Sequence, residues 1–202
     1  VHDDFNKNKS KFFNHEKFTK VKTGALLFSY LNHKFGNYKE DIFFLHDTLD
    51  IKKGNCLSFA SLYTLLAMRE NLNISILYSD DHIKNRLTTK NEIIDIEHTH
   101  NQGFGIEDNK IKYKEYQINY LIPIIIHDRG VFKLKKENNI KKAIEDFNKA
   151  ISLAPEIGHF YYNKGITYYL NNDPQNGLIY IEKALELNPN HKKAKKFLVQ
   201  NG

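Results

Sequence analysis

Apolar residues in the first part of the chain recur every three to four positions, which is typical of helices that bury one face. Val21, Leu26 and Tyr30 fall on one face of a helix that we expect to end near Gly36. A second, shorter helix is expected over residues 39–49. The pattern therefore predicts a helical start to the fold.

A third helix is predicted from Cys56 to about Glu70, and its sequence is apolar on nearly every side. A helix without a polar face is expected to be central and buried. After it the period changes to that of strands, over residues 74–78, 82–87 and 92–97. The polar links between these strands are short, which favours antiparallel neighbours.

The last third of the chain repeats itself with a period of 34 residues, which is typical of helix–turn–helix arrays. Four positions recur at this interval, namely Ala143, Phe147, Ala150 and Pro155 as Gly177, Ile181, Ala184 and Pro189. This segment resembles the tetratricopeptide repeat family, in which small residues let paired helices approach and a proline ends the second helix. The resemblance implies two repeats and a capping helix over residues 190–199.

These patterns divide the 202 residues into three parts. Residues 1–14 are polar and expected to be frayed. Residues 15–122 form an α+β domain, and residues 123–202 form the all-α repeats. Whether residues 111–126 are helix or strand is left open by their mixture of aromatic and aliphatic side chains.

The only cysteine, Cys56, lies where the third helix is expected to begin. Gly54 and Asn55 allow a sharp turn, and Ser58 suits the first turn of a helix. Unpaired amide N–H groups and the positive end of the helix dipole stabilise a negatively charged sulfur there. The position favours a nucleophile, and an inert core thiol is the alternative.

A nucleophilic cysteine needs a base, and the base needs a group that orients it. His82 opens the second expected strand, and Asp95 and Glu97 lie on one face of the third. Strands lie about 4.8 Å apart, so a histidine and a carboxylate at paired positions can form a hydrogen bond. His82 is therefore the candidate base, with Glu97 or Asp95 as its partner. In the alternative interpretation, His82 and Glu97 are solvent-exposed surface residues.

The residues around these positions resemble bacterial transglutaminase-like domains that carry C-terminal tetratricopeptide repeats. The resemblance spans roughly residues 15–122 and rests on Lys53–Ser58, Leu62–Tyr63, His82 and Ile96–Thr99. It implies a papain-like fold, in which a central helix bearing the cysteine packs on a small antiparallel sheet bearing the histidine and the acid.

The resemblance also implies the roles of the residues. Cys56 would be the nucleophile, His82 the base, and Glu97 or Asp95 the orienting carboxylate. The chemistry of the family is acyl transfer through a thioester, which gives amide hydrolysis, transamidation or isopeptide cleavage.

Charge and composition limit the kinds of partner and cofactor that the sequence predicts. The formal net charge is +6, but the lysines are scattered among acids, so no nucleic-acid partner is expected. His98 and His100 could hold a metal with Asp95, but loop histidines are usually solvated, so we expect neither a metal nor a cofactor.

The compartment is left open by the sequence. A single cysteine excludes an internal disulfide, and no apolar run approaches the length of a membrane span. Membrane association is expected only through a segment preceding Val1. Both the cell envelope or periplasm and the cytoplasm are compatible with the chain.

Two functions follow. The preferred interpretation is a protein-interaction protein, in which the repeats and a degenerate transglutaminase-like domain hold a protein or peptide. The alternative is an active cysteine acyl transferase. The candidate partner-binding residues are aromatic, as in many binding hot spots: Tyr161, Tyr162, Tyr168 and Tyr169.

Overall fold

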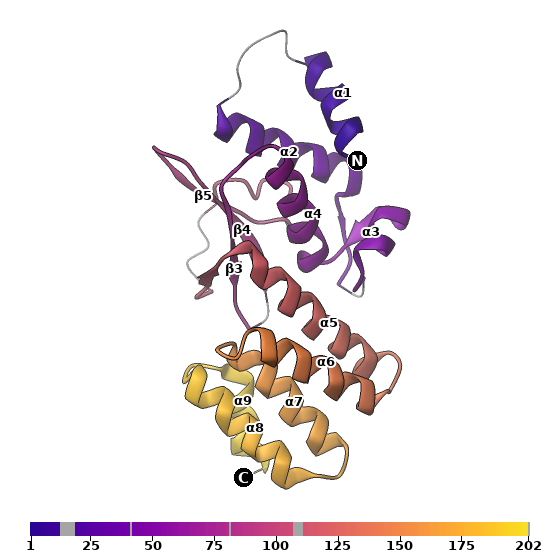
Figure 1. Ribbon diagram of the computed structural model, residues 1–202, viewed down its shortest axis with the longest axis vertical. Coiled ribbons are helices and arrows are strands. Elements are labelled where there is room, and N and C mark those ends of the chain that lie inside the picture. The colour runs from indigo at the N-terminus through magenta and orange to yellow at the C-terminus, as the bar shows by residue number, and fades with distance from the viewer. Residues whose placement is uncertain (13–18, 41, 81, 107–110, 202) are drawn as a thin grey trace. The chain divides into compact units, whose positions relative to one another are not determined.

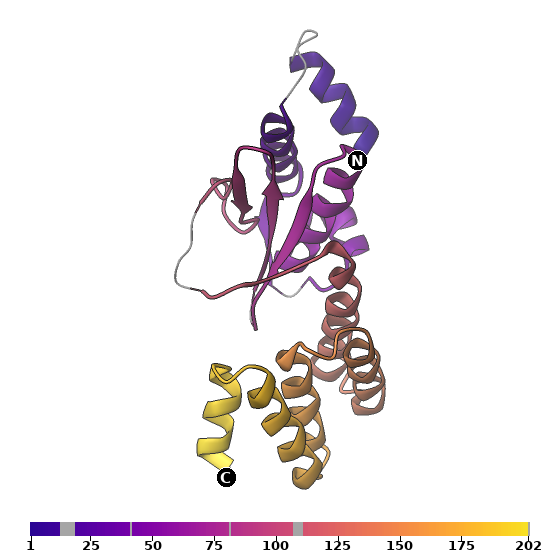
Figure 2. The ribbon, with the colours of Figure 1, turned by 60° about the vertical axis from the view of Figure 1, so that its left-hand side comes forward.

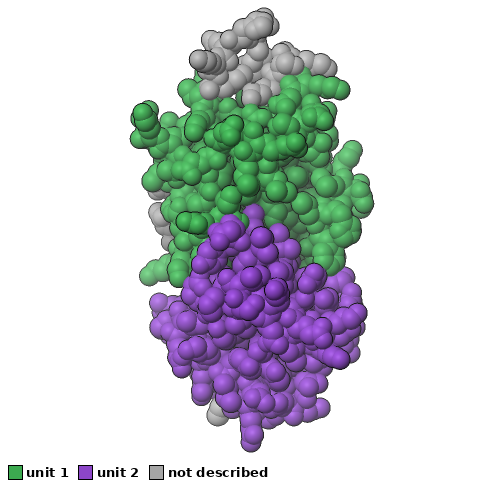
Figure 3. Space-filling model, in the orientation of Figure 1, with its two compact units in different colours: residues 1–118 green, residues 119–202 purple. Residues whose placement is uncertain are grey.

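The computed structural model describes residues 1–12, 19–40, 42–80, 82–106 and 111–201. They fall into two compact units, Val1–Ile118 (unit 1) and Asn119–Gly202 (unit 2), which Figure 3 shows in different colours. Unit 1 combines helices with a small antiparallel sheet, whereas unit 2 is helical (Figure 1). The predicted order, a mixed α+β part followed by helical repeats, is confirmed.

Unit 1 begins with helix α1 (His2–Phe12), where the sequence predicts a frayed segment. Phe5 is buried and packs edge-on against Tyr30, with ring centroids 5.4 Å apart. This apolar contact gives the polar helix an attachment to the core. Positions 13 and 14 of the predicted frayed segment lie outside the described residues.

Helix α2 (Lys20–Phe35) is capped by Thr19, whose side chain accepts a hydrogen bond from the Lys22 amide. Strand β1 (Asn37–Tyr38) then pairs in parallel with β2 (Lys53–Gly54). Helix α3 (Leu45–Ile51) lies between these strands. The helix predicted over residues 39–49 is thus shorter and begins later, because the chain first forms the β1 pairing.

Helix α4 (Cys56–Arg69) begins at the cysteine, as predicted. The side-chain oxygen of Asn55 caps it by accepting hydrogen bonds from the Ser58 amide (2.8 Å) and hydroxyl (3.0 Å). Most of the helix is buried, but Leu65 and Met68 are half exposed and form an apolar stripe.

The sheet consists of β3 (Ile74–Tyr78), β4 (Ile83–Thr88), β5 (Ile93–Ile96) and β6 (Lys114–Tyr116). Its order is β5–β4–β3–β6 and its pairs are antiparallel, as Figure 2 shows from the side. The antiparallel arrangement of the first three strands is confirmed. The segment whose structure the sequence leaves open contributes β6, a short 3₁₀ turn (Ile118–Tyr120) and the start of the next helix.

Unit 2 contains α5 (Leu121–Lys135), α6 (Ile140–Leu153), α7 (Gly158–Leu170), α8 (Pro174–Leu187) and α9 (Lys192–Asn201). Helices α7 and α8 approach closely at Gly165, where a Cβ atom would lie 2.7 Å from the carbonyl oxygen of Gly177. Small residues at these positions are what the 34-residue pattern predicts. No helix within the described ranges is both long enough and apolar enough to cross a bilayer.

Candidate functional site

The three residues predicted to act together come from three elements of unit 1. Cys56 is the first residue of α4, His82 precedes β4, and Glu97 follows β5. The β4–β5 register pairs Asn85 with Ile96, so the start of β4 lies beside the end of β5. The hairpin thereby brings His82 next to Glu97.

A short hydrogen bond joins these two side chains. His82 Nε2 lies 2.6 Å from Glu97 Oε2. The other carboxylate oxygen, Oε1, accepts hydrogen bonds from the amide (3.0 Å) and the hydroxyl (2.7 Å) of Thr99. Burial alone would raise the pKa of Glu97, but the bonds with His82 and Thr99 lower it to about 2. Glu97 is therefore ionised, and His82 donates through Nε2.

The imidazole of His82 also interacts with the thiol of Cys56. Burial alone would lower the pKa of His82, but hydrogen bonds with Cys56 and Glu97 raise it to about 10. Since Nε2 is engaged by Glu97, Nδ1 is the ring nitrogen available to the sulfur. A charged imidazole between a sulfur and a carboxylate is the arrangement that supports a thiolate nucleophile.

The loop after β5 holds the carboxylate in place from the backbone side. The amide of Glu97 donates to the carbonyl oxygen of Gly103 at 2.8 Å. A Cβ atom on residue 103 would lie 1.8 Å from the Glu97 carbonyl oxygen, so only glycine fits this approach. The position of Glu97 is therefore fixed through both its side chain and its main chain.

Two tyrosines lie near the three residues. The Tyr113 ring meets His82 edge-on, with centroids 6.2 Å apart, and Lys84 Nζ lies 4.5 Å from the centre of the same ring. Tyr38 is held beside the start of α4 by the β1–β2 pairing. Burial raises the pKa of Tyr38, and the nearby Cys56 raises it further, so its phenol keeps its proton and can donate.

Asp95, the second candidate for the orienting carboxylate, has other partners. Its oxygens lie 3.1 Å from Lys84 Nζ and 2.7 Å from Arg86 Nε. Burial alone would raise the pKa of Asp95, but the bonds with Arg86 and Lys84 lower it. Because the Lys84 side chain is only 2% exposed, its charge requires a counter-ion, and Asp95 supplies it. Of the two carboxylates, the structure brings only Glu97 to His82.

His98, expected to be a solvated loop residue, is instead buried. Its Nε2 lies 2.6 Å from Asn85 Oδ1, and burial lowers its pKa to about 3. Asn85 in turn donates to Thr64 Oγ1 of α4 at 2.8 Å. The sequence interpretation missed Asn85 and Thr64. The available signal was the alternation of Ile83, Asn85 and Leu87, which marks position 85 as inward-facing.

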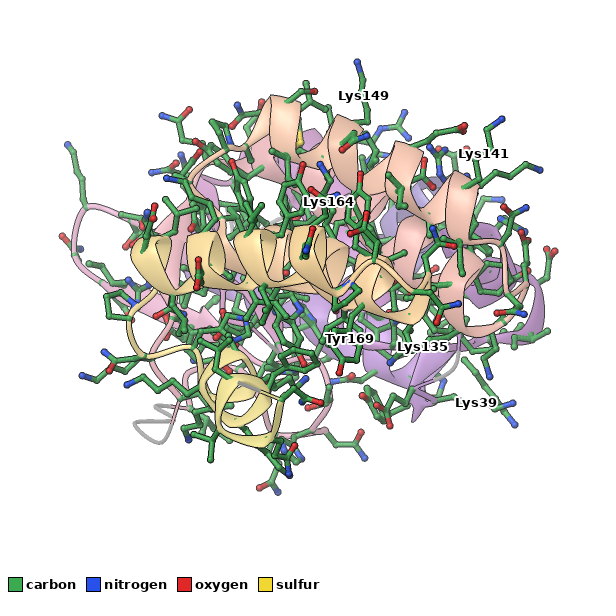
Figure 4. The ribbon with its side chains drawn as sticks, turned by 90° about the horizontal axis from the view of Figure 1, so that it is seen from below. Lys39, Lys135, Lys141, Lys149, Lys164 and Tyr169 are labelled. Atoms are coloured by element: carbon green, nitrogen blue, oxygen red, sulfur yellow. The ribbon has the colours of Figure 1, made fainter. Side chains whose placement is uncertain are left out.

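The four candidate tyrosines of unit 2 lie on α7 as two pairs, each spaced by seven residues. Tyr168 stacks on Tyr180 of α8, with centroids 5.4 Å apart. Tyr162 packs on His191 at 4.8 Å, and Tyr169 meets Phe197 of α9 edge-on at 5.0 Å. All four side chains are partly exposed. Figure 4 labels Tyr169 together with Lys164 of the same helix.

Comparison with known families bears on unit 2. Residues 158–191 and residues 134–157 each match a model of the tetratricopeptide repeat. The first match covers α7 and α8, and the second covers α6 with only the end of α5. The prediction of two such repeats is confirmed, and repeats of this kind suggest protein–protein interaction. No curated protein sequence matches the chain.

Proposed function

We propose that unit 1 carries a cysteine acyl-transfer site of the transglutaminase-like type. The observation that carries this proposal is the placement of His82 between Cys56 and Glu97. Support also comes from a helix that presents its first residue beside an antiparallel hairpin, which resembles a papain-like arrangement. In this proposal Cys56 is the nucleophile, His82 the acid and base, and Glu97 the orienting group.

The reaction starts from a thiolate and an imidazolium. The Cys56 sulfur attacks the carbonyl carbon of an amide or ester, and the carbonyl oxygen becomes negatively charged. The helix supplies no acceptor for the amides of its first turn, Cys56 and Leu57, so they are available to bind this oxygen. His82 then gives its proton to the leaving group, and a thioester forms. Water or an amine, deprotonated by His82, attacks the thioester, and the sulfur leaves as a thiolate, which restores the thiolate and the imidazolium.

An acyl donor of minimal structure tests this proposal without knowledge of the substrate. With p-nitrophenyl acetate, the full chain is expected to release a burst of about one equivalent of nitrophenolate, because the acyl-enzyme forms faster than it breaks down. Mass spectrometry of a digest is expected to find the acetyl group on the peptide containing Cys56. Cys56→Ala is the control. A burst that persists in this variant, or acetyl groups on lysines alone, would exclude the proposal.

We propose further that unit 2 binds a protein or peptide partner along α7. Stacked helical repeats offer extended binding surfaces, and partly exposed tyrosines are common anchors in such interfaces. The four tyrosines cannot all face one partner equally, because residues 161 and 162 project about 100° apart on a helix. The pair Tyr162 and Tyr169 faces α9 and is the pair that we assign to the partner.

A photo-crosslinking residue placed at single positions of the full chain tests this assignment. Positions 162 and 169 are expected to capture the same protein or peptide, whereas position 179, an exposed isoleucine of α8, is expected to capture it weakly or not at all. Mass spectrometry identifies the crosslinked species. Equal capture from position 179, or capture from 161 and 168 alone, would place the interface elsewhere.

A further inference from the structure

The three elements that carry the candidate catalytic residues are joined a second time, in the core beneath them. Each contributes one further polar residue: Thr64 from α4, Asn85 from β4 and His98 from the segment after β5. We call these three residues the buried chain. Polar side chains are uncommon in such a core, and these form one connected set.

The hydrogen bonds of the buried chain run in one direction. The Thr64 hydroxyl donates to the Ala60 carbonyl oxygen (2.8 Å), so its oxygen is free to accept from Asn85 Nδ2 (2.8 Å). Asn85 Oδ1 then faces His98 Nε2 at 2.6 Å and requires a proton on that nitrogen. Each of these three contacts has one donor and one acceptor when His98 is neutral and protonated on Nε2.

The surroundings of the buried chain are apolar and close-packed. Thr64 and Asn85 are at most 1% exposed, and His98 is 5% exposed. The His98 ring packs against Tyr63 at 5.1 Å and Phe28 at 6.0 Å. At such a buried position, water cannot replace a hydrogen-bond partner that is lost. The hydrogen bonds of the buried chain therefore oppose any displacement of α4 along the hairpin.

We propose that the buried chain sets the distance between the sulfur, the imidazole and the carboxylate, and that Thr64, Asn85 and His98 are positioning residues. The inference rests on the proposed acyl-transfer function for its catalytic meaning. His98 is adjacent to Glu97, Asn85 lies three residues after His82, and Thr64 lies about two helical turns after Cys56. A shift of one element at the buried chain therefore moves its catalytic side chain by a similar amount.

A merely structural role would lower stability without changing the site, so the test uses a readout of the site itself. Asn85→Leu removes both hydrogen bonds at similar volume, and His98→Phe removes the donor while keeping a ring. His98→Gln is the conservative variant, because its amide can donate from nearly the same place. Leu31→Ala is the matched control, since Leu31 is a core residue of α2, which carries no part of the site.

The primary measurement is the NMR titration of the His82 ring in the full chain. The midpoint is expected to fall by about one pH unit or more in Asn85→Leu and His98→Phe, because the imidazolium loses optimal contact with its partners. Leu31→Ala and His98→Gln are expected to stay close to the wild type. A folded Asn85→Leu protein with an unchanged midpoint, or an equal fall in Leu31→Ala, would overturn the proposal.

Alkylation of Cys56 by iodoacetamide at pH 6 separates this proposal from the proposed function. If both hold, the rate falls about tenfold in Asn85→Leu, in parallel with the titration. If the wild-type thiol reacts no faster than in the unfolded chain while the His82 midpoint still responds to Asn85→Leu, the acyl-transfer function is wrong and the positioning stands. If the wild-type thiol reacts rapidly and Asn85→Leu matches it, the positioning is wrong and the function stands.

Discussion

Replacing His82 with alanine is expected to slow the alkylation of Cys56 by iodoacetamide at pH 6 by about tenfold or more. An ordinary thiol is less than about 1% thiolate at this pH. In the wild type a charged imidazole, with a pKa of about 10, stands beside the sulfur and favours the thiolate. The variant leaves only the helix N-terminus to do so. The rate is followed by mass spectrometry, with the urea-unfolded chain as the reference for an unactivated thiol.

The two carboxylates provide the sharper comparison, because they lie two residues apart in one segment. Glu97→Gln is expected to slow alkylation, since an amide neither stabilises the imidazolium nor holds it by a charge-assisted bond. Asp95→Asn is expected to preserve the rate while lowering the thermal stability, because Asp95 neutralises the buried Lys84. Equal slowing by both substitutions, measured well below the melting temperatures, would contradict the separate roles assigned to Glu97 and Asp95.

The sequence was sufficient to predict which elements meet at this site. The start of α4 is marked by Asn55 and Cys56, because capping is a local interaction and needs no tertiary contact. The meeting of His82 and Glu97 follows from strand alternation and a short polar link, which together specify an antiparallel hairpin. Both depend on residues close together in sequence.

The choice between Asp95 and Glu97 could not be made from the sequence. Both side chains lie on one face of the strand, and only the position of Lys84 and Arg86 on the neighbouring strand assigns Asp95 to them. The burial of His98 could not be predicted from the sequence either, because it depends on packing against Phe28 and Tyr63 from distant helices. The first case was decided by contacts across the hairpin, and the second by contacts with distant helices.

Unit 2 contains a second group of buried histidines, which leads to the other large expected effect. His127 of α5, His159 of α7 and His191 before α9 are all less than 8% exposed. The side-chain amide of Asn163 lies 2.9 Å from His127 Nε2 and 3.0 Å from His159 Nε2. His159 Nδ1 lies 3.1 Å from His191 Nε2. These contacts connect the helices of the two repeats to the segment that precedes α9.

The hydrogen bonds of this group determine which ring nitrogen of His159 and of His191 carries the proton. The Ala194 amide donates to His191 Nδ1 at 3.1 Å, so a neutral His191 carries its proton on Nε2 and donates to His159 Nδ1. His159 then carries its proton on Nε2, and the amide of Asn163 must present its oxygen as the acceptor. One more proton on His159 would place a donor against a donor. The group is therefore stable only with its histidines neutral.

Acid is expected to destabilise the repeats for this reason. Burial lowers the pKa of His127 to about 3, and burial together with the neighbouring His127, His191 and Lys193 lowers the pKa of His159 well below its usual value. Between pH 3 and 6.5 these histidines bind protons in the unfolded chain but stay neutral in the folded protein. The free energy of unfolding therefore falls as the pH falls. From pH 7 to pH 5 the loss is about 2 kcal/mol for His127, and His159 adds a loss of the same sign.

Hydrogen exchange followed by mass spectrometry distinguishes the two units in this experiment. After correction for intrinsic rates, peptides from α7 and α8 are expected to lose protection between pH 7 and pH 5 by at least about 2 kcal/mol. Unit 1 is expected to lose less, because the partly buried His82 and the buried His98 act in opposite directions. The raised pKa of His82 gives stability that is fully present below pH 6.5, while His98, with its pKa near 3, loses stability over the same range. His159→Gln should reduce the pH dependence of α7 alone, and equal acid sensitivity of both units would contradict the neutral histidine group.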